Sequence, residues 1–158
     1  MGSEMCIRDR FCTGTDSLGL SLLTANNSGS IPGANSTSDG AGNTTALVQF
    51  FTSSPAGEFC NALALNGFTD WYLPAPDELQ ALFDNRIAIG GFASTSYYSS
   101  RHSSGNTFFQ NFTDGSTEIS NSESVARNIR CVRRQTDTVG SAFINISPGV
   151  IDLSLIHI

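Results

Sequence analysis

The first candidates for chemistry are the acidic residues of one short stretch, GFTDWYLPAPDEL at 67–79. Asp77 and Glu78 are adjacent carboxylates, and paired acids can act as general acid and base. The same stretch holds the only tryptophan of the chain and two of its five prolines. Pro76 favours the start of a helix, and carboxylates in a first helical turn offset the exposed N–H groups there. Helix capping therefore explains these acids better than catalysis.

All eight basic residues are arginine, and four of them gather near the end of the main sequence: Arg127, Arg130, Arg133 and Arg134. Guanidinium groups bind sulfate or carboxylate through paired hydrogen bonds, so an anion site is one hypothesis. Alternation along a strand separates Arg130 from Arg133, however. Structural pairing is favoured, with three acids as partners: Asp70, Asp77 and Glu78. The net charge of −6 disfavours nucleic acid as a partner.

Metal and catalytic sites find little support. His102 is the only histidine once the chain ends are set aside, and no CxxC spacing suggests zinc. A single histidine gives no basis for a Ser/His/Asp arrangement, so we expect no enzyme activity. Asp114 in NFTDGS is a conceivable calcium ligand, but calcium takes about six to eight oxygens and a hairpin turn explains Asp114 better. We expect no metal and no cofactor, with calcium the one alternative left open.

Aromatic and polar residues after position 96 are the candidates for ligand contact. Tyr97 or Tyr98 could stack on a sugar ring, although alternation along a strand sends about half of such aromatics to the core. Arg101, His102 and Asn106 fall in a predicted connecting loop, RHSSGN, and are expected to be exposed. Loops on a rigid scaffold commonly carry recognition. These five residues form the predicted ligand-binding set.

The two ends of the chain are expected to be foreign to the domain. EMCIRD at 4–9 and LSLIHI at 153–158 are what opposite strands of one transposase adapter encode. We therefore set residues 1–10 and 153–158 aside as adapter translation and expect no fold there. What remains divides into a strand and loop at 11–38, a main domain at 39–134, and a linker or the start of another domain at 135–152.

Hydrophobic spacing and turn residues predict an α+β domain. A strand over 18–22 leads into a long Gly/Ser/Asn-rich loop, and residues 46–51 fit either a strand or the start of a helix. Ser54 and Pro55 predict a helix over 55–65, closed by a left-handed cap at Asn66-Gly67. A second helix starts at Pro76. Short strands follow, at 95–99, 107–112 and 128–133.

Five pieces of sequence recur together in one known family: DGAGNTTAL at 39–47, SPAGEFCNALALNGFTDWYLPAPDEL at 54–79, YYSS at 97–100, FFQNFTDGS at 108–116 and NIRCVRR at 128–134. In this combination the chain resembles the C-terminal domain of the Legionella collagen-like adhesin. That family of bacterial secreted domains is similar to the C-type lectin and formylglycine-generating-enzyme folds. The resemblance covers residues 39–134.

The resemblance implies a C-type-lectin-like fold, with two helices packed on a small antiparallel sheet and long loops. It also implies a disulfide between Cys60, on the first helix, and Cys131, on the last strand, and with it an oxidising compartment. Trp71, Pro74 and Leu79 take structural roles, with Trp71 in the core. Two departures are Tyr98, where the family usually has Trp, and Ala75, which cannot cap the second helix as Thr often does. The sulfated polysaccharides associated with the adhesin call for a basic surface, which this acidic chain lacks.

Two functions from different classes follow. The first is an extracellular recognition or adhesion module that binds glycan or protein through the loops between 85 and 128. The alternative is a structural or assembly domain of a surface fibre or phage-tail-like protein, with no small ligand. Either places the chain outside the cell or on its surface, and a homo-oligomer, such as a trimer, would form through flanking segments. No apolar run is long enough to span a membrane.

Overall fold

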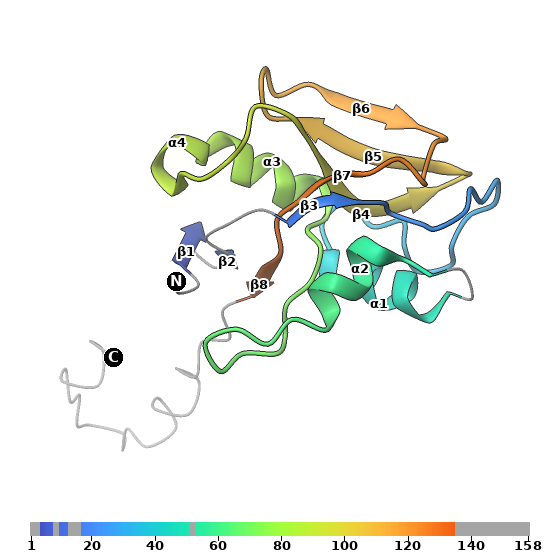
Figure 1. Cartoon of the computed structure of the whole chain (residues 1–158), viewed down its shortest axis with the longest axis horizontal. Coiled ribbons are helices and arrows are strands. Elements are labelled where there is room, and N and C mark those ends of the chain that lie inside the picture. The colour runs from blue at the N-terminus through green and yellow to red at the C-terminus, as the bar shows by residue number, and fades with distance from the viewer. Residues whose placement is uncertain (1–3, 8–9, 13–16, 51–52, 135–158) are drawn as a thin grey trace, which may run out of the picture.

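The computed structural model describes residues 4–7, 10–12, 17–50 and 53–134, with side chains from Gly19 onward. This part of the chain forms twelve elements, and Figure 1 labels them. The helices are α1 (Gly40–Gln49), α2 (Pro55–Asn61), α3 (Pro76–Asp84) and α4 (Arg86–Ile89). The strands are β1 (Glu4–Ile7), β2 (Arg10–Cys12), β3 (Ser17–Leu20), β4 (Ser96–Ser103), β5 (Asn106–Asn111), β6 (Thr117–Ser120), β7 (Arg127–Ile129) and β8 (Val132–Arg134). The α+β prediction is confirmed.

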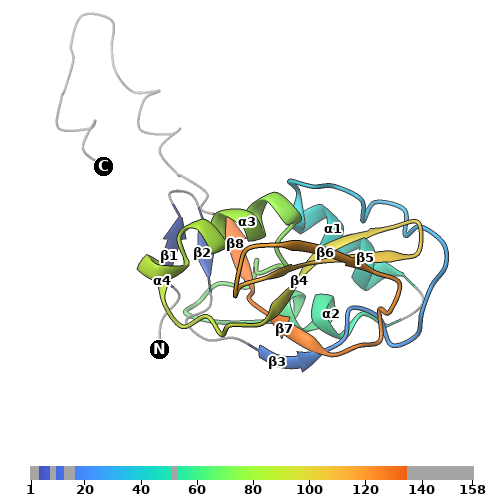
Figure 2. The ribbon, with the colours of Figure 1, turned by 90° about the horizontal axis from the view of Figure 1, so that it is seen from above.

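The main sheet has five strands in the order β3-β7-β4-β5-β6, which Figure 2 shows from one edge. Strands β4, β5 and β6 form an antiparallel meander, in which Tyr98 faces Phe109 and Phe109 faces Glu118. Strand β7 then returns beside β4 and pairs with it in parallel, Tyr97 opposite Asn128. The prediction of a purely antiparallel sheet is therefore wrong. The connection at 121–126 carries the chain back across the sheet, so β7 enters it in the direction of β4.

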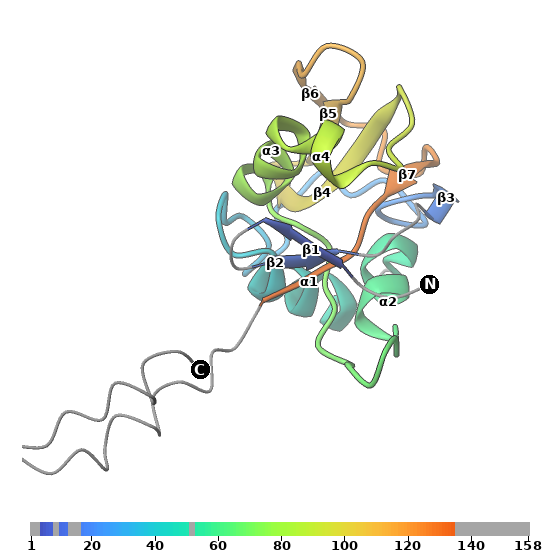
Figure 3. The same ribbon diagram turned by 90° about the vertical axis from the view of Figure 1, so that its left-hand side faces the viewer.

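Helices cover both faces of this sheet. Tyr97 and Tyr98 point to opposite faces of β4, as strand alternation requires, yet both are fully buried. Tyr98 lies in a core cluster with Leu47 of α1 and Cys60 of α2. Tyr97 packs instead with Leu79 of α3, in a second cluster on the other face. Figure 3 shows α3 and α4 on one side of β4, away from α1 and α2. The expected stacking face at Tyr97 or Tyr98 is absent because no face of this strand is left to solvent.

Helix α1 was not predicted as a helix over its full length, and four helices replace the two expected. Its sequence, GAGNTTALVQ, has low intrinsic helix propensity. Tertiary contacts compensate: the Asp39 carboxylate accepts from the Gly42 N–H, and the buried Asn43 amide donates to the Ser36 carbonyl. Gly40 allows a close approach, because a Cβ there would lie 2.7 Å from the Leu73 carbonyl oxygen. The helix therefore depends on partners that local sequence cannot reveal.

Helix α2 begins as predicted and ends early. The Ser54 hydroxyl accepts from the Gly57 N–H, and Pro55 occupies the first turn. The helix ends at Asn61 instead of 65, and Asn66-Gly67 is not its cap. Both residues have positive φ, 55° and 79°, and form a tight turn in which Leu65 pairs with Phe68. The left-handed conformation was predicted correctly, but it serves a turn.

The stretch at 71–79 joins the two core clusters. Trp71 and Leu73 are buried in the first cluster, and Tyr72, between them, is buried in the second. Tyr72 pairs with Val132 through two backbone hydrogen bonds, and the Pro74 carbonyl accepts from Ser100. The structural roles expected for Trp71, Pro74 and Leu79 agree with their burial. This stretch therefore contributes side chains to both core clusters.

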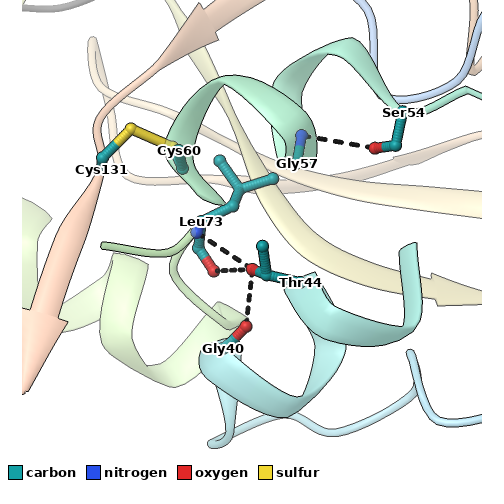
Figure 4. The surroundings of a disulfide bond; sticks show 7 residues. All are labelled: Gly40, Thr44, Ser54, Gly57, Cys60, Leu73 and Cys131. Carbon is teal, nitrogen blue, oxygen red and sulfur yellow. Dashed lines mark hydrogen bonds between the residues drawn. A yellow bond between two sulfur atoms is a disulfide. The ribbon is translucent and has the colours of Figure 1, made fainter. Parts of the chain in front are cut away.

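The predicted disulfide is present. Cys60 and Cys131 are bonded, with Cα atoms 5.5 Å apart and a sequence separation of 71 (Figure 4). Cys131 does not lie within a strand, however, because the strand predicted at 128–133 is divided into β7 and β8. Strand β7 belongs to the main sheet and β8 to a second sheet of order β1-β2-β8. The disulfide ties α2 to the point where the chain changes sheets.

Residues set aside as adapter translation take part in the second sheet. Strand β1 pairs with β2, and β2 pairs with β8, where Arg10 is opposite Arg134 and Cys12 is opposite Val132. Figure 3 shows β1 and β2 side by side. The strands at Glu4–Ile7 and from Arg10 onward therefore differ from the expectation that residues 1–10 carry no fold. The physical reason is that β8 has an open edge, which a further strand can pair with. The predictions for 135–152 and 153–158 concern residues outside the part of the chain that the structure describes.

Candidate functional site: a polar hollow at the end of the sheet

A polar hollow of about 420 Å³ lies where the loop after β3 meets the turn between β4 and β5. Its lining consists of amide, hydroxyl and backbone groups together with one carboxylate: Asn26, Asn27, Ser28, Ser104, Gly105, Asn106, Asn121 and Glu123. None of these residues is basic or aromatic. The hollow therefore offers hydrogen-bonding groups and one carboxylate, without a cation.

Backbone hydrogen bonds fix the two walls of the hollow to each other. The Gly105 N–H donates to the Gly29 carbonyl (2.9 Å), and the Ser104 N–H donates to the Ser30 hydroxyl (2.9 Å). Gly105 has a φ of +72°, and a Cβ there would meet the Ser28 carbonyl oxygen at 2.8 Å. Glycine is required at this position both for its backbone conformation and for the close approach. The rim is thus a fixed part of the fold.

Glu123 supports the floor of the hollow. Its carboxylate is fully buried, and Oε2 accepts from the Asn27 N–H at 2.7 Å. Oε1 lies 2.7 Å from Nε2 of the buried His102. Because a carboxylate only accepts, Nε2 carries the proton in this contact. The Glu123 N–H donates to Asn26 Oδ1, and its carbonyl accepts from Leu22 and Leu23. One residue therefore positions the whole 22–27 segment.

His102 has no catalytic partner in the part of the chain that the structure describes. Its second nitrogen, Nδ1, is buried there without a hydrogen-bond partner. The ring thus forms a pair with Glu123 and no Ser–His pair. The prediction that His102 is exposed in a loop is wrong, because β4 continues through Ser103 and leaves only Ser104-Gly105 as the turn.

The predicted ligand-binding set separates in the structure. Asn106 lines the hollow, and His102 lies directly behind it, in contact with Glu123. Tyr97 and Tyr98 are buried, and burial raises the pKa of the Tyr98 hydroxyl, which donates to the Val125 carbonyl. The Arg101 guanidinium is half-buried over the Phe108 ring and donates to Asn35 Oδ1. Ligand contact by Arg101 or Asn106 stays a prediction.

Of the residues that line the hollow, the predicted ligand-binding set named only Asn106. Four others lie in the loops between 85 and 128 that the sequence indicated, and the 26–28 segment was missed: the four are Ser104, Gly105, Asn121 and Glu123. The run NNS at 26–28 was visible as part of a polar loop. The hydrogen bond between the Asn27 N–H and the Glu123 carboxylate joins residues that are 96 positions apart in sequence. A local sequence pattern cannot predict such a pairing. The one available signal was a carboxylate, Glu123, in a stretch of Ser and Asn that lacks basic residues.

The arginine cluster does not form a single anion site. Arg133 makes two hydrogen bonds to the Asp70 carboxylate (2.7 and 2.9 Å), which confirms the favoured structural pairing for this residue. That contact holds the pKa of Asp70 below its ordinary value. Arg130 is buried, donates to the Gly91 carbonyl and lies over the Phe92 ring. Arg127 lies over the Phe109 ring.

Asp114 closes the turn between β5 and β6. Its Oδ1 accepts from the Ser116 N–H at 2.9 Å and from the Ser116 hydroxyl at 2.7 Å, and these bonds lower the pKa of Asp114. The turn interpretation is confirmed. Within the described ranges no three His, Cys, Asp or Glu side chains gather closely enough to hold a metal ion. Likewise, no helix described here has the length and apolar character needed to cross a membrane.

Comparison with known proteins gives one informative likeness. No family model matches the sequence, and no curated protein is found to be similar to it. Among solved structures, the fold is similar to that of a fimbrial protein from Bacteroides ovatus ATCC 8483, with a TM-score of 0.58 and 14% sequence identity. The alignment covers 82% of this chain and 36% of the fimbrial chain. The match therefore spans about a third of the length of the fimbrial chain.

Proposed function

We propose that the chain is a non-enzymatic, extracellular module of a bacterial surface fibre, with a structural or assembly role. The observation that carries this proposal is the shared fold with a fimbrial protein over 82% of the chain. The Cys60–Cys131 disulfide supports it, because such bonds persist in oxidising compartments outside the cytoplasm. Helices on both faces of the sheet give a rigid body suited to a fibre subunit.

Recognition is the second candidate function, and the polar hollow favours it. The hollow presents amides and hydroxyls on walls that backbone hydrogen bonds hold in place. A fibre module with such a site would act as an adhesin, and many copies along a fibre would strengthen weak contacts through avidity. This location overlaps the loops between 85 and 128 that the sequence indicated, and adds the 26–28 segment.

Two relations inferred from sequence belong to this proposal. One is membership of the family of the C-terminal domain of the Legionella collagen-like adhesin, with the C-type-lectin-like fold which that family implies. The link between a helix and the end of the sheet through Cys60 and Cys131 supports it. The other is assembly as a homo-oligomer, such as a trimer, through flanking segments. Both agree with a role at the cell surface.

Antibody labelling tests the fibre proposal directly. Antibodies raised against the folded domain should decorate filaments on intact cells that express the gene from its own promoter, as seen by immunogold electron microscopy. Permeabilised cells serve as the control for total antigen. Label found only after permeabilisation would overturn the fibre proposal. Adhesion of beads coated with the domain to host or bacterial cells separately tests recognition.

A further inference from the structure

We propose that the polar hollow binds a neutral saccharide through hydrogen bonds to its asparagine and serine side chains. This inference rests on the recognition function proposed above and assigns it a ligand class. Sugar hydroxyls both donate and accept hydrogen bonds, as amide and hydroxyl side chains also do. The matching of these groups, in a site without basic residues, is the basis of the assignment.

Several polar groups of the hollow have no hydrogen-bond partner in the described part of the chain. They are Asn26 Nδ2, Asn106 Oδ1, the Asn121 amide and the hydroxyls of Ser28 and Ser104, whereas other atoms of the same residues are used to hold the walls. Asn26 and Asn121 are exposed, and Asn106 is half-buried. The groups that face the opening are thus free to exchange water for the hydroxyls of a ligand.

Charge selects against acidic sugars. The only ionisable group that lines the hollow is Glu123, and a sulfated or carboxylated ligand would approach a carboxylate with no cation to offset it. Both Glu123 oxygens already accept hydrogen bonds, from Asn27 and His102. Arg101, the nearest arginine in sequence, is committed to Asn35 and to the Phe108 ring. A neutral ligand fits best.

The size and rigidity of the hollow suit a mono- or disaccharide. Its volume, about 420 Å³, falls within the range of about 300–1,000 Å³ that is common for small-molecule sites. Glu123 fixes the Asn26–Asn27 wall, and the Gly105–Gly29 bond fixes the opposite wall. Preformed walls lower the entropic cost of binding. No aromatic ring lines the site, so we expect weak binding, with a Kd on the order of 1 mM.

Calcium is the competing occupant and is less well served. A calcium ion needs about six to eight oxygen ligands. Asn26 Oδ1 and Asn27 Oδ1 already accept backbone N–H groups, and the two Glu123 oxygens are also engaged. Too few free oxygens remain to form a coordination shell. Calcium therefore enters the experiment as an alternative outcome.

The experiment is an NMR titration of the ¹⁵N-labelled chain, run with EDTA and again with calcium. A sulfated disaccharide serves as the comparison ligand, and the test ligands are glucose, galactose, mannose, maltose and lactose. We expect at least one of these sugars to shift the side-chain amide signals of Asn26, Asn106 and Asn121. The double variant Asn106→Ala/Asn121→Ala should bind that sugar at least tenfold more weakly, equivalent to about 1.4 kcal/mol. Asn61→Ala removes an exposed asparagine at the end of α2, outside the hollow, and should change nothing.

Glu123→Gln tests the positioning role of the floor. Gln keeps the shape of the side chain but has only one acceptor oxygen, so it cannot accept from both the Asn27 N–H and His102 Nε2–H. Its NH₂ group either opposes the Asn27 N–H or faces His102, whose ring must then carry its proton on Nδ1. Sugar binding should weaken while the backbone spectrum keeps its dispersion. Spectra of every variant are compared with the parent first, so that loss of fold is separated from loss of binding.

Three results would overturn the saccharide assignment: no sugar shifts the hollow amides, only a sulfated disaccharide does so, or binding appears only with calcium and vanishes with EDTA. If coated beads still adhere to cells through Asn106 and Asn121 while no sugar binds, recognition stands and the saccharide class is wrong. If adhesion of the beads to cells does not depend on Asn106 and Asn121 either, the proposed recognition function of the hollow is wrong as well. The immunogold result is independent of both.

Discussion

Glu78 supplies one half of a capping box at the start of α3, because its side chain binds the N–H of Ala75, whereas Ala75 has no side chain to cap the first turn. Its carboxylate is buried, accepts from the Ala75 N–H at 2.9 Å and also accepts from the Tyr72 hydroxyl at 3.0 Å. It lies against Gly40, which has no side chain to displace it. Asp77, the neighbouring acid, is exposed. Two adjacent carboxylates therefore have different roles, which chain position alone does not distinguish.

Replacing each acid separately tests this difference. Glu78→Ala leaves a buried backbone N–H and a buried tyrosine hydroxyl without an acceptor, and should lower the free energy of unfolding by about 2–3 kcal/mol. Asp77→Ala is the matched control from the same helical turn, and should cost less than about 1 kcal/mol because only the helix-dipole interaction is lost. Urea denaturation followed by tryptophan fluorescence measures both. Equal losses would contradict the capping role of Glu78.

The Asp70–Arg133 pair should make the free energy of unfolding depend on pH in the acidic range. The two Arg133 hydrogen bonds lower the pKa of Asp70 in the folded state. A lowered folded-state pKa means that this contribution is complete above the pKa of the unfolded chain and is lost as pH falls through the folded-state pKa. Asp70 is half-exposed, so solvent screening keeps the effect small. We therefore predict a modest loss of stability at acidic pH that is specific to this pair.

Asp70→Asn is the variant for that measurement. At neutral pH the variant should be less stable than the parent, and the difference should shrink as pH falls from about 5 to 2. Asp77→Asn is the control, because Asp77 is an exposed acid outside the Asp70–Arg133 pair. Stability is measured by urea denaturation at each pH. A difference between parent and Asp70→Asn that stays constant down to the lowest pH would refute the role of ionised Asp70.

At the level of elements, the disulfide determines how α2 is attached to the sheet. Helix α2 has only seven residues, too short to be stable alone, and the bond at Cys60 fixes it to the break between β7 and β8. The bond closes a loop of 71 positions, and in the chain-entropy model this contributes about 4 kcal/mol. The covalent link and the buried Ser54 cap together hold this helix in place.

Removing both cysteines tests that contribution. Cys60→Ala/Cys131→Ala should lose about 4 kcal/mol of unfolding free energy relative to the oxidised parent. The parent measured in reducing agent is the matched control, since it loses the bond while keeping both side chains. Both samples should melt at similar temperatures, well below the oxidised parent. A double variant that melts with the oxidised parent would show that packing alone holds α2.

For the whole molecule, the two core clusters share one sheet and should unfold together. Trp71 and Leu73 belong to the cluster beneath α1 and α2, and Tyr72 belongs to the cluster beneath α3. Loss of α1 and α2 would expose the face of β4 that carries Tyr98, and loss of α3 would expose the face that carries Tyr97. Either loss uncovers a fully buried tyrosine of the shared strand. We therefore predict a single cooperative transition in the oxidised chain.

Two probes distinguish one transition from two. Tryptophan fluorescence reports on Trp71, the only tryptophan, and so on the α1/α2 side of the sheet. Far-UV circular dichroism reports on all helices and strands. The two melting curves should coincide, and the calorimetric and van 't Hoff enthalpies should agree. Curves separated by several degrees would show that the layers unfold independently.

Several elements were predictable from local sequence alone. Ser54-Pro55 predicted the start of α2, Pro76 with its acids predicted α3, and Asp114-Gly115 predicted the turn after β5. Each signal acts within a few residues, because caps and turns satisfy backbone groups close by. The disulfide was correctly predicted as well, but only through resemblance to a family, since cysteine spacing alone does not specify a partner.

Tertiary structure decided what depends on distant partners. Helix α1 forms from weak helix formers because Asp39, Asn43 and Thr44 find partners, the last with Leu73 29 positions away. Tyr97, Tyr98 and His102 are buried because helices cover both faces of β4, and a single strand cannot show how many of its faces are covered. The hollow brings residues near 27, 105 and 123 together through Glu123. Such contacts arise only when the chain folds back on itself, which local patterns of residues do not encode.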